Sequence, residues 1–388
     1  MNEMENKKSK KDRVFFAIYG GFFIGILLEV LILSLMLPDR TFSEKERRSL
    51  TTFPAVSLSS VLDGSFETGI EDYSADQFPL RDRLMTLKTS FCNVLGMKES
   101  NGVYYGKDGF LMERFDTPDG ELLSHTAVAV SDFSARHESS NVYFMLAPTA
   151  VSLYPEMLPK NASNADQDAY ISNFYESLSE EVRPVDVREA LEEAKAAGTR
   201  LYYHSDHHWT TDGAKAAYEA AIEVMDLKES DYRRAIISND FLGALSAKSG
   251  FSIPEKDCIV AYLPEDETLK YIVRNDESGE TRASVYHGEA LSGPDPYLVF
   301  FGGNYPSLTI ETTAKNDRSL LIIKDSYANS FMPFMLENYR KITVIDPRYY
   351  SRQVDMLFYL EEYDDVLFLY NASTLAKDKN LYKVLETR

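Results

Sequence analysis

Hydrophobic and polar positions divide the chain into one long apolar segment near the N-terminus and a large region of mixed pattern after it. The apolar segment runs from Val14 to Leu37, and Glu29 is its one charged residue. Its 24 residues, at about 1.5 Å per residue, exceed the roughly 30 Å thickness of a bilayer core. The pattern therefore predicts a transmembrane anchor over residues 14–37. A cleaved signal peptide is the alternative, although no small-x-small cleavage site follows the segment.

The charges around this segment predict its orientation. Residues 1–13 form a basic tail with five basic and three acidic side chains. Because positive loops stay inside, we expect the tail in the cytoplasm and the rest of the chain outside the cell membrane, as a single-pass protein. Glu29 is costly in a bilayer, so it is either protonated or paired with a second membrane protein.

Beyond the anchor, the pattern predicts a membrane-proximal helical region over residues 38–100, with an amphipathic helix after Phe78-Pro79. The run GVYYGKDGFLMERF, starting at Gly102, predicts a hairpin. From there on, apolar runs typical of buried strands alternate with helical patterns, which predicts a mainly parallel sheet flanked by helices within an α/β domain over residues 101–388. A β-rich insertion at about 228–315, with pieces such as CIVAYL and YLVFFGG, interrupts the rhythm. The expected strands lie at 141–148, 185–187, 201–205, 319–326, 341–346 and 364–373, and the expected helices at about 166–180, 188–198 and 211–225, the last of these capped by Thr211 or Asp212.

Composition narrows the class of protein. With 44% hydrophobic residues in 388, the chain can bury a full core. A net charge of −20, or −22 for the chain after residue 13, disfavours binding to phosphate backbones, so we expect no nucleic-acid partner. Cys92 and Cys258 are too few and too far apart for a disulfide framework or a thiolate zinc site, and they either pair or stay free.

Candidate chemistry gathers in the segment HSDHHWTTDG, which holds three of the six histidines and the one tryptophan, Trp209. In an extended or turning backbone, Asp206 and His208 project to one side and His207 to the other. Asp206 can then fix the tautomer of His208 and leave its second ring nitrogen as a general base. A metal site of His204, His208 and Asp206 or Asp212 is a second hypothesis, but the spacing matches no zinc motif, so we assign no metal and no cofactor.

A nucleophile for such a base is expected at the end of another strand. Ser326 directly follows the run LLIIKD and precedes a helical pattern, so it is either the nucleophile or a helix N-cap. Ser330 lies a turn further on and is a poorer candidate. Asn371, at the end of VLFLY, is either a donor to an oxyanion or a turn residue.

The segment SDHHW resembles the motif of the DHHW proteins, and its D-x-H-W core is similar to that of the alginate O-acetyltransferase periplasmic proteins of the SGNH hydrolase superfamily. EDYSADQFPLRDR, VYYGKDGFLMER and MLAPTAVSLYP extend the likeness over most of the chain. The resemblance implies an SGNH-like fold and a catalytic triad of Asp206, His208 and Ser326. The candidate oxyanion and substrate residues are Asn371, Arg348, Tyr349, Tyr327, His207 and Trp209. The context KDSYANS departs from glycine-containing nucleophile motifs.

The resemblance implies a bacterial, membrane-anchored extracellular enzyme that transfers or removes O-acetyl groups on a cell-surface glycan. Because acetyl-CoA is cytosolic, it further implies a multi-pass membrane O-acyltransferase as partner. Two other functions stay open at this point. One is a noncatalytic envelope protein that binds glycans or serves as a scaffold, and the other is a metal-dependent hydrolase.

Overall fold

The computed structural model describes residues 2–43, 48–62, 64–360 and 362–386. The chain divides into two compact units, with the boundary between Cys92 and Asn93. Each unit holds one cysteine, and both Cys92 and Cys258 are free thiols.

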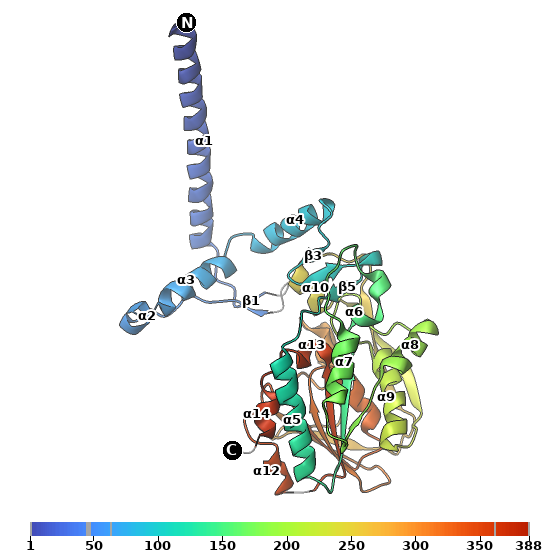
Figure 1. The fold of residues 1–388 in the computed structure, drawn as a ribbon. Coiled ribbons are helices and arrows are strands. Elements are labelled where there is room, and N and C mark those ends of the chain that lie inside the picture. Colours follow the sequence, from blue (N-terminus) through green and yellow to red (C-terminus); the bar gives the residue numbers. More distant parts are fainter. Residues whose placement is uncertain (1, 44–47, 63, 361, 387–388) are drawn as a thin grey trace. The chain divides into compact units, whose positions relative to one another are not determined.

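The N-terminal unit is mainly helical. Its first helix, α1, contains Val14–Met36, a stretch long and apolar enough to cross a membrane, so the predicted N-terminal apolar helix is confirmed. Length and composition fit an anchor and a signal sequence alike. The predicted amphipathic helix after Phe78-Pro79 is also present, as α4. The elements of this unit are α1 Asn2–Met36, β1 Phe42–Ser43, β2 Arg48–Ser49, α2 Leu58–Leu62, α3 Ser65–Asp76 and α4 Arg81–Val94 (Figure 1).

The second unit is built on an eight-stranded sheet with the order β11-β10-β12-β14-β13-β15-β6-β7. The five strands from β14 to β7 are parallel, and the three at the other end are antiparallel. This confirms the prediction of a mainly parallel α/β sheet. In chain order the strands are β6 Asn141–Ala147, β7 Val182–Pro184, β10 Tyr271–Asn275, β11 Thr281–Arg282, β12 Ser307–Thr312, β13 Ser319–Lys324, β14 Lys341–Ile345 and β15 Asp365–Asn371.

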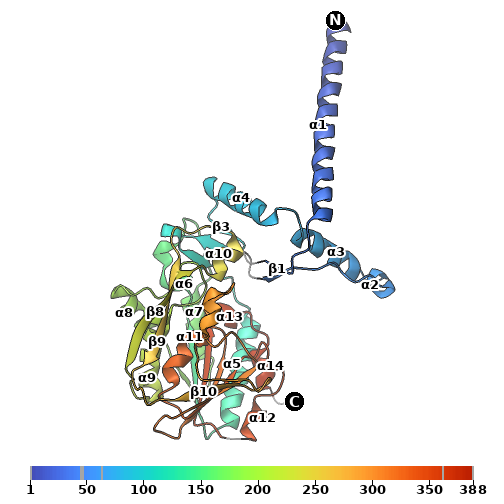
Figure 2. The same cartoon turned by 180° about the vertical axis from the view of Figure 1, so that it is seen from behind.

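The central strands are buried because both faces of the sheet are covered. Strands β6, β13 and β15 are almost continuous apolar runs, as expected for parallel strands between two helical layers. The sheet runs between α5 on one side and α9 on the other in Figure 1, and Figure 2 gives the reverse view. The helices of this unit are α5 Gly120–Arg136, α6 Ala150–Leu153, α7 Gln167–Glu176, α8 Arg188–Ala196, α9 Thr211–Met225, α10 Ala244–Ser249, α11 Ala328–Phe331, α12 Asp355–Phe358, α13 Ala372–Leu375 and α14 Leu381–Leu385, with 3-10 turns η1 Lys107–Gly109, η2 Pro155–Met157, η3 Gly288–Ser292, η4 Pro296–Val299 and η5 Met332–Met335.

Two small sheets accompany the large one. The predicted hairpin is present as β4 Val103–Tyr105 and β5 Leu111–Glu113, joined by β3 Glu99–Ser100. Strands β8 Tyr232–Phe241 and β9 Asp257–Pro264 pair with each other alone. The later strands of the region that interrupts the α/β rhythm, β10 to β12, instead extend the large sheet as antiparallel strands.

Four local predictions differ from the structure. The expected strand at 185–187 is absent, and the strand in this region, β7, ends just before it at Pro184. The expected strand at 201–205 is only an isolated bridge between Tyr202 and Trp209, because the chain turns back on itself between them. The run YLVFFGG forms the turn η4 rather than a strand, since Pro296 begins it and lacks the N–H that a sheet needs. Helix α9 is capped by Thr210, whose side chain accepts from the Gly213 N–H, and not by Thr211 or Asp212.

Candidate active site

The site lies at the carboxyl edge of the parallel sheet, where β13, β15 and β6 end side by side. Ser326 follows β13 by two residues, and Asn371 is the last residue of β15. The bridge between Tyr202 and Trp209 closes a loop over residues 203–208, which carries Asp206 and His208. Functional residues of open α/β sheets are found at such an edge.

The three side chains of the predicted triad are hydrogen-bonded one to the next. The Nδ1 of His208 is 2.6 Å from Asp206 Oδ1, and its Nε2 is 2.7 Å from Ser326 Oγ. All three residues are buried, with Ser326 at 9% the most exposed of them. The carboxylate, the imidazole and the hydroxyl therefore form one continuous hydrogen-bonded chain.

The carboxylate of Asp206 is held by backbone donors as well as by the imidazole. Its Oδ1 also accepts from the backbone N–H of His208 at 3.0 Å, and its Oδ2 accepts from that of Ala244 at 2.7 Å. A side chain at Gly243 would collide with Asp206, so the glycine lets the backbone of this segment close around the carboxylate. No local pattern predicts this contact, since the two segments are far apart in the chain.

The loop is fixed from a second direction by Asp257, the first residue of β9. Asp257 accepts hydrogen bonds from the backbone N–H groups of His204 and Ser205 and from the Ser205 hydroxyl. A fully hydrogen-bonded buried carboxylate of this kind rigidifies the segment that it binds.

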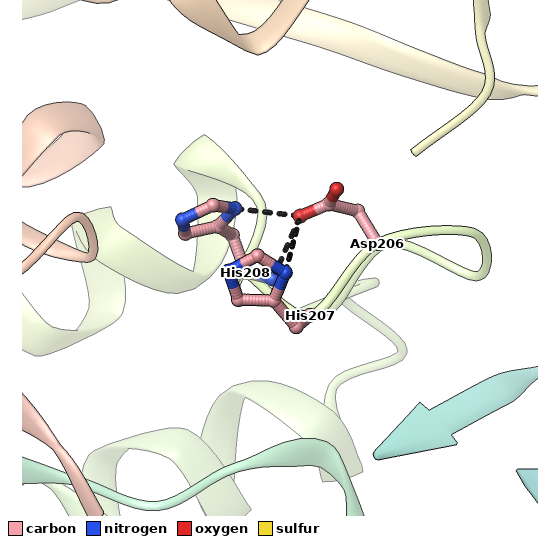
Figure 3. A group of neighbouring side chains, drawn as sticks. All are labelled: Asp206, His207 and His208. Carbon is pink, nitrogen blue, oxygen red and sulfur yellow. Dashed lines mark hydrogen bonds and ion pairs between the residues drawn. The ribbon is translucent and has the colours of Figure 1, made fainter. Parts of the chain in front are cut away.

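His207 does not lie where the alternation of side chains predicted. Its ring centroid is 3.9 Å from that of His208, and its Nδ1 is 3.7 Å from Asp206 Oδ1 (Figure 3). The prediction that His207 points away is wrong, because the loop is a tight turn and not an extended strand.

Electrostatics favour a neutral imidazole beside an ionised carboxylate. Burial, reinforced by His207, lowers the pKa of His208 to about 4 against the pull of Asp206. For Asp206, burial alone would raise the pKa, but His207, His208 and the Ala244 N–H outweigh it and hold the pKa well below its usual range. At neutral pH His208 is thus unprotonated at one ring nitrogen and can accept a proton.

Tyr297, from η4, is a neighbour of the imidazole that the sequence did not reveal. Its ring stacks on His208 at 3.8 Å between centroids and 9° between planes, and its hydroxyl donates to the Ser326 carbonyl at 3.3 Å. The stack fixes the plane of the imidazole and shields it from water.

Trp209 and Tyr327 hold the serine turn in place. The indole N–H of Trp209 donates to the Tyr327 carbonyl and to Ser330 Oγ, each at 3.0 Å. Tyr327 is fully buried, and its hydroxyl donates to the His207 carbonyl. Both of these candidate substrate residues therefore face the protein interior.

Asn371 is also turned away from the serine. Its amide nitrogen donates to Asp325 Oδ2 at 2.6 Å and to Thr374 Oγ1 at 2.7 Å, which uses both of its N–H donors. Asp325 in turn accepts from the backbone N–H groups of Asn371 and Tyr327. In this arrangement Asn371 fixes the turn beside Ser326 and has no donor left for an oxyanion.

Arg348 lies on the loop after β14 and donates to both oxygens of Asp346, at 2.8 and 2.6 Å. The same carboxylate lies 3.6 Å from the ammonium of Lys324, whose pKa burial lowers to about 8. The positive charge of Arg348 contributes to the low pKa of His208, so the guanidinium acts on the imidazole electrostatically. Tyr349, the next residue, is 55% exposed.

The structure groups possible metal ligands differently from the set that the metal hypothesis expects. Among the described residues, Asp206, His207 and His208 place possible ligand atoms within 4.8 Å of one another. His204 instead stacks on Phe110, and Asp212 binds Arg234. Both ring nitrogens of His208 are already hydrogen-bonded, to Asp206 and Ser326. The predicted ligand set of His204, His208 and Asp206 or Asp212 is therefore not assembled.

Residues 103–236 match the family described as "SGNH hydrolase-like domain, acetyltransferase AlgX". The second unit has an SGNH-like fold. The matched part of this SGNH-like domain includes Asp206 and His208 and ends before Ser326.

Solved structures agree with this assignment. A DHHW family protein from Eubacterium siraeum is 26% identical, with a TM-score of 0.63 over 74% of this chain and 95% of that one. Bacillus cereus PatB1, solved with a sulfonyl adduct, is 20% identical, with a TM-score of 0.62 over 73% of this chain and 97% of that one. The predicted DHHW-like and SGNH-like character is confirmed.

One curated relative, "Probable alginate O-acetylase AlgJ" from Pseudomonas putida, is 25% identical over 229 residues, which are 56% of this chain and 56% of the relative. The SGNH-like chain thus spans little more than half the length of that protein.

Proposed function

We propose that this protein is a membrane-anchored, extracytoplasmic enzyme that transfers O-acetyl groups to a cell-surface polysaccharide, or removes them, through Ser326, His208 and Asp206. The observation that carries the proposal is the hydrogen-bonded chain from Asp206 Oδ1 through both nitrogens of His208 to Ser326 Oγ. The AlgX acetyltransferase family and the name of the AlgJ relative support an acetylated polysaccharide as the substrate class.

The residues would divide the chemistry as follows. His208 Nε2 takes the proton of the Ser326 hydroxyl while Oγ attacks the carbonyl carbon of the acetyl donor. Asp206 accepts the Nδ1–H bond and stabilises the imidazolium that results. The imidazolium then protonates the leaving group of the donor, which yields the acetyl-serine.

The second half of the reaction decides between transferase and esterase. His208 takes a proton from a sugar hydroxyl or from water, the oxygen attacks the acetyl-serine, and Ser326 regains its proton. Arg348 is the candidate for stabilising negative charge in this site, because its charge already acts on the buried imidazole. Asn371 is not assigned that role, since its donors are bound to Asp325 and Thr374.

The apolar helix α1 supports attachment to a membrane, and the basic residues before it support an outward-facing second unit. An enzyme in that position has no direct access to cytosolic acetyl-CoA. We therefore include a multi-pass membrane O-acyltransferase as acetyl donor in the proposal, with Glu29 as its contact in the bilayer.

Labelling of the full-length chain with a fluorophosphonate probe tests the nucleophile. We expect wild-type protein and Ser330→Ala to be labelled and Ser326→Ala to be unlabelled, because only Ser326 Oγ contacts His208 Nε2 within the described residues. Ser326→Ala should also lower acetyl-ester hydrolysis by about 10⁴ to 10⁶-fold. Equal labelling or hydrolysis by Ser326→Ala and wild type would leave a noncatalytic glycan-binding or scaffold protein as the better hypothesis.

A further inference from the structure

One hollow of the SGNH-like unit lies on the sheet itself, outside the buried triad. This sheet groove has a volume of about 650 Å³, within the roughly 300–1,000 Å³ typical of ligand sites. Its floor is formed by strands β10, β12 and β14, and its walls by the loop 349–352, by α12 and by Tyr363.

The floor is polar where the rest of the sheet is apolar. Thr343 of β14 lies opposite Thr309 of β12, which lies opposite Arg274 of β10, so the three form one row across the strands. Alternate residues on the same strands, such as Ile342 and Leu308, are buried in the core on the other face. One face of this part of the sheet therefore packs into the hydrophobic core, and the other face lines the groove.

The floor hydroxyls retain bonding capacity. Ser307 Oγ and Thr309 Oγ1 donate to Asp276 Oδ2 at 2.6 and 3.0 Å, so each oxygen can still accept a bond. Thr343 Oγ1 is hydrogen-bonded to the Tyr363 hydroxyl at 3.1 Å. The residues Ser307, Thr309 and Thr343 are 4–9% exposed, and their hydrogen bonds fix the hydroxyls in position before any ligand arrives.

Charged donors complete the floor. Arg274 donates through Nε to Asp276 Oδ1 at 3.1 Å, and within the described residues this bond leaves its two Nη groups for a ligand. The charge of Asp276 is paired with this guanidinium, and its Oδ2 accepts hydrogen bonds from the two hydroxyls. The groove also holds Lys341 and Arg352, so basic side chains outnumber acidic ones in a protein of net charge −20.

The walls supply aromatic surface. Tyr349, Tyr350 and Tyr363 line the groove, and Tyr349 presents a ring that is 55% exposed. Tyrosine rings over a floor of hydroxyl and guanidinium groups suit a ligand whose surface alternates C–H faces with hydroxyls. A pyranose chain has that alternation.

The loop after β14 carries both a groove residue, Tyr349, and Arg348, whose charge acts on the triad. Tyr349 follows Arg348, whose guanidinium carbon lies 5.6 Å from the Tyr349 ring centroid. Arg348 in turn acts electrostatically on His208. Because β13 and β14 are parallel neighbours, Ser326 and Arg348 both follow the carboxyl ends of adjacent strands.

We propose that the sheet groove binds a segment of the polysaccharide acceptor, as a glycan subsite beside the acyl-transfer site. This inference rests on the proposed function for the identity of the polymer. Its occupant is an oligosaccharide, either neutral or acidic, and the hydroxyl floor together with Tyr349 recognises the sugar rings.

Direct binding tests the subsite without catalysis. Full-length Ser326→Ala in detergent micelles is titrated by calorimetry with two probes, a neutral xylose hexamer and an acidic mannuronate hexamer. We expect at least one hexamer to bind, and Tyr349→Ala or Thr309→Val in the same background to raise its Kd at least tenfold. A preference for the acidic probe would assign the ionic role to Arg274, and Arg274→Gln should then weaken that probe alone.

Tyr359→Ala is the matched control, because Tyr359 is 81% exposed and does not line the groove. It should leave the Kd unchanged. The inference is overturned if neither hexamer binds, or if Tyr349→Ala binds as tightly as Tyr359→Ala. Hydrolysis of a small acetyl ester by wild type and by Ser326→Ala is measured in parallel. Since that assay does not involve the groove, it shows separately whether the proposed function itself fails.

Discussion

Replacing Asp206 by asparagine is the most demanding test of the proton path, because it changes charge and hydrogen-bond direction and almost nothing in shape. The carboxylate accepts three hydrogen bonds, from His208 Nδ1, from the His208 backbone N–H and from the Ala244 backbone N–H. An amide has only one acceptor oxygen. Whichever way it is turned, its NH₂ group faces a donor.

The orientation that keeps the Ala244 bond sets the amide NH₂ against His208. The imidazole then gives up the proton on Nδ1 and carries it on Nε2, which faces Ser326 Oγ at 2.7 Å. A protonated Nε2 cannot accept the serine proton. We expect kcat to fall by about 10³ to 10⁴-fold, which corresponds to about 4 to 5.5 kcal/mol of transition-state stabilisation.

The assay is hydrolysis of a small acetyl ester by the full-length chain, with circular dichroism to show that Asp206→Asn is folded. Asp212→Asn is the control from the same segment. Asp212 binds Arg234 and the Tyr262 hydroxyl instead of His208, so its kcat should stay within about twofold of wild type. A folded Asp206→Asn variant with more than a tenth of the wild-type kcat would refute the proton path.

Three further predictions concern the triad and its surroundings. Because the pKa of His208 is lowered to about 4, kcat/KM for ester hydrolysis should be constant around neutral pH and fall only as the pH drops through about 4. His207→Gln should raise the midpoint of this fall, since His207 contributes to the low pKa. A wild-type midpoint above pH 6 would contradict the neutral imidazole. In the unfolded chain His208 titrates near pH 6.5, so between pH 6.5 and 4 the unfolded state binds the extra proton and the free energy of unfolding should fall as the pH is lowered, which denaturant titration measures. Trp209→Phe removes the donor to the Tyr327 carbonyl and Ser330 Oγ, and should lower the free energy of unfolding by about 1–2 kcal/mol. The same variant should have a lower kcat, with a smaller change in KM. Unchanged kcat and stability in that variant would show that the indole N–H does not hold the serine turn.

Much of the fold could be predicted from sequence because its signals are local. The apolar run of α1, the buried strands β6, β13 and β15 and the helices between them follow from the periodicity of side chains over a few residues. The pairing of Asp206 with His208 is also local, since a spacing of two places both side chains at one turn.

The residues around that pair depend on contacts between distant segments. The alternation rule misplaced His207, because a bridge between Tyr202 and Trp209 bends the chain that the rule treats as extended. Asn371 was a reasonable oxyanion donor from its position at a strand end. Only the structure reveals that the carboxylate of Asp325 and the hydroxyl of Thr374 each accept one of its amide hydrogens.

The sequence by itself determined an apolar N-terminal helix, an α/β sheet and the two residues of one loop that can pass a proton, because each depends on neighbours along the chain. The tertiary structure decided that Ser326 meets His208 across 118 positions and that Tyr297 stacks on the same ring. It also decided that Thr343, Thr309 and Arg274 form one row along the floor of a groove. Strand order and register set these distances, and no short-range pattern of side chains specifies which strands lie side by side.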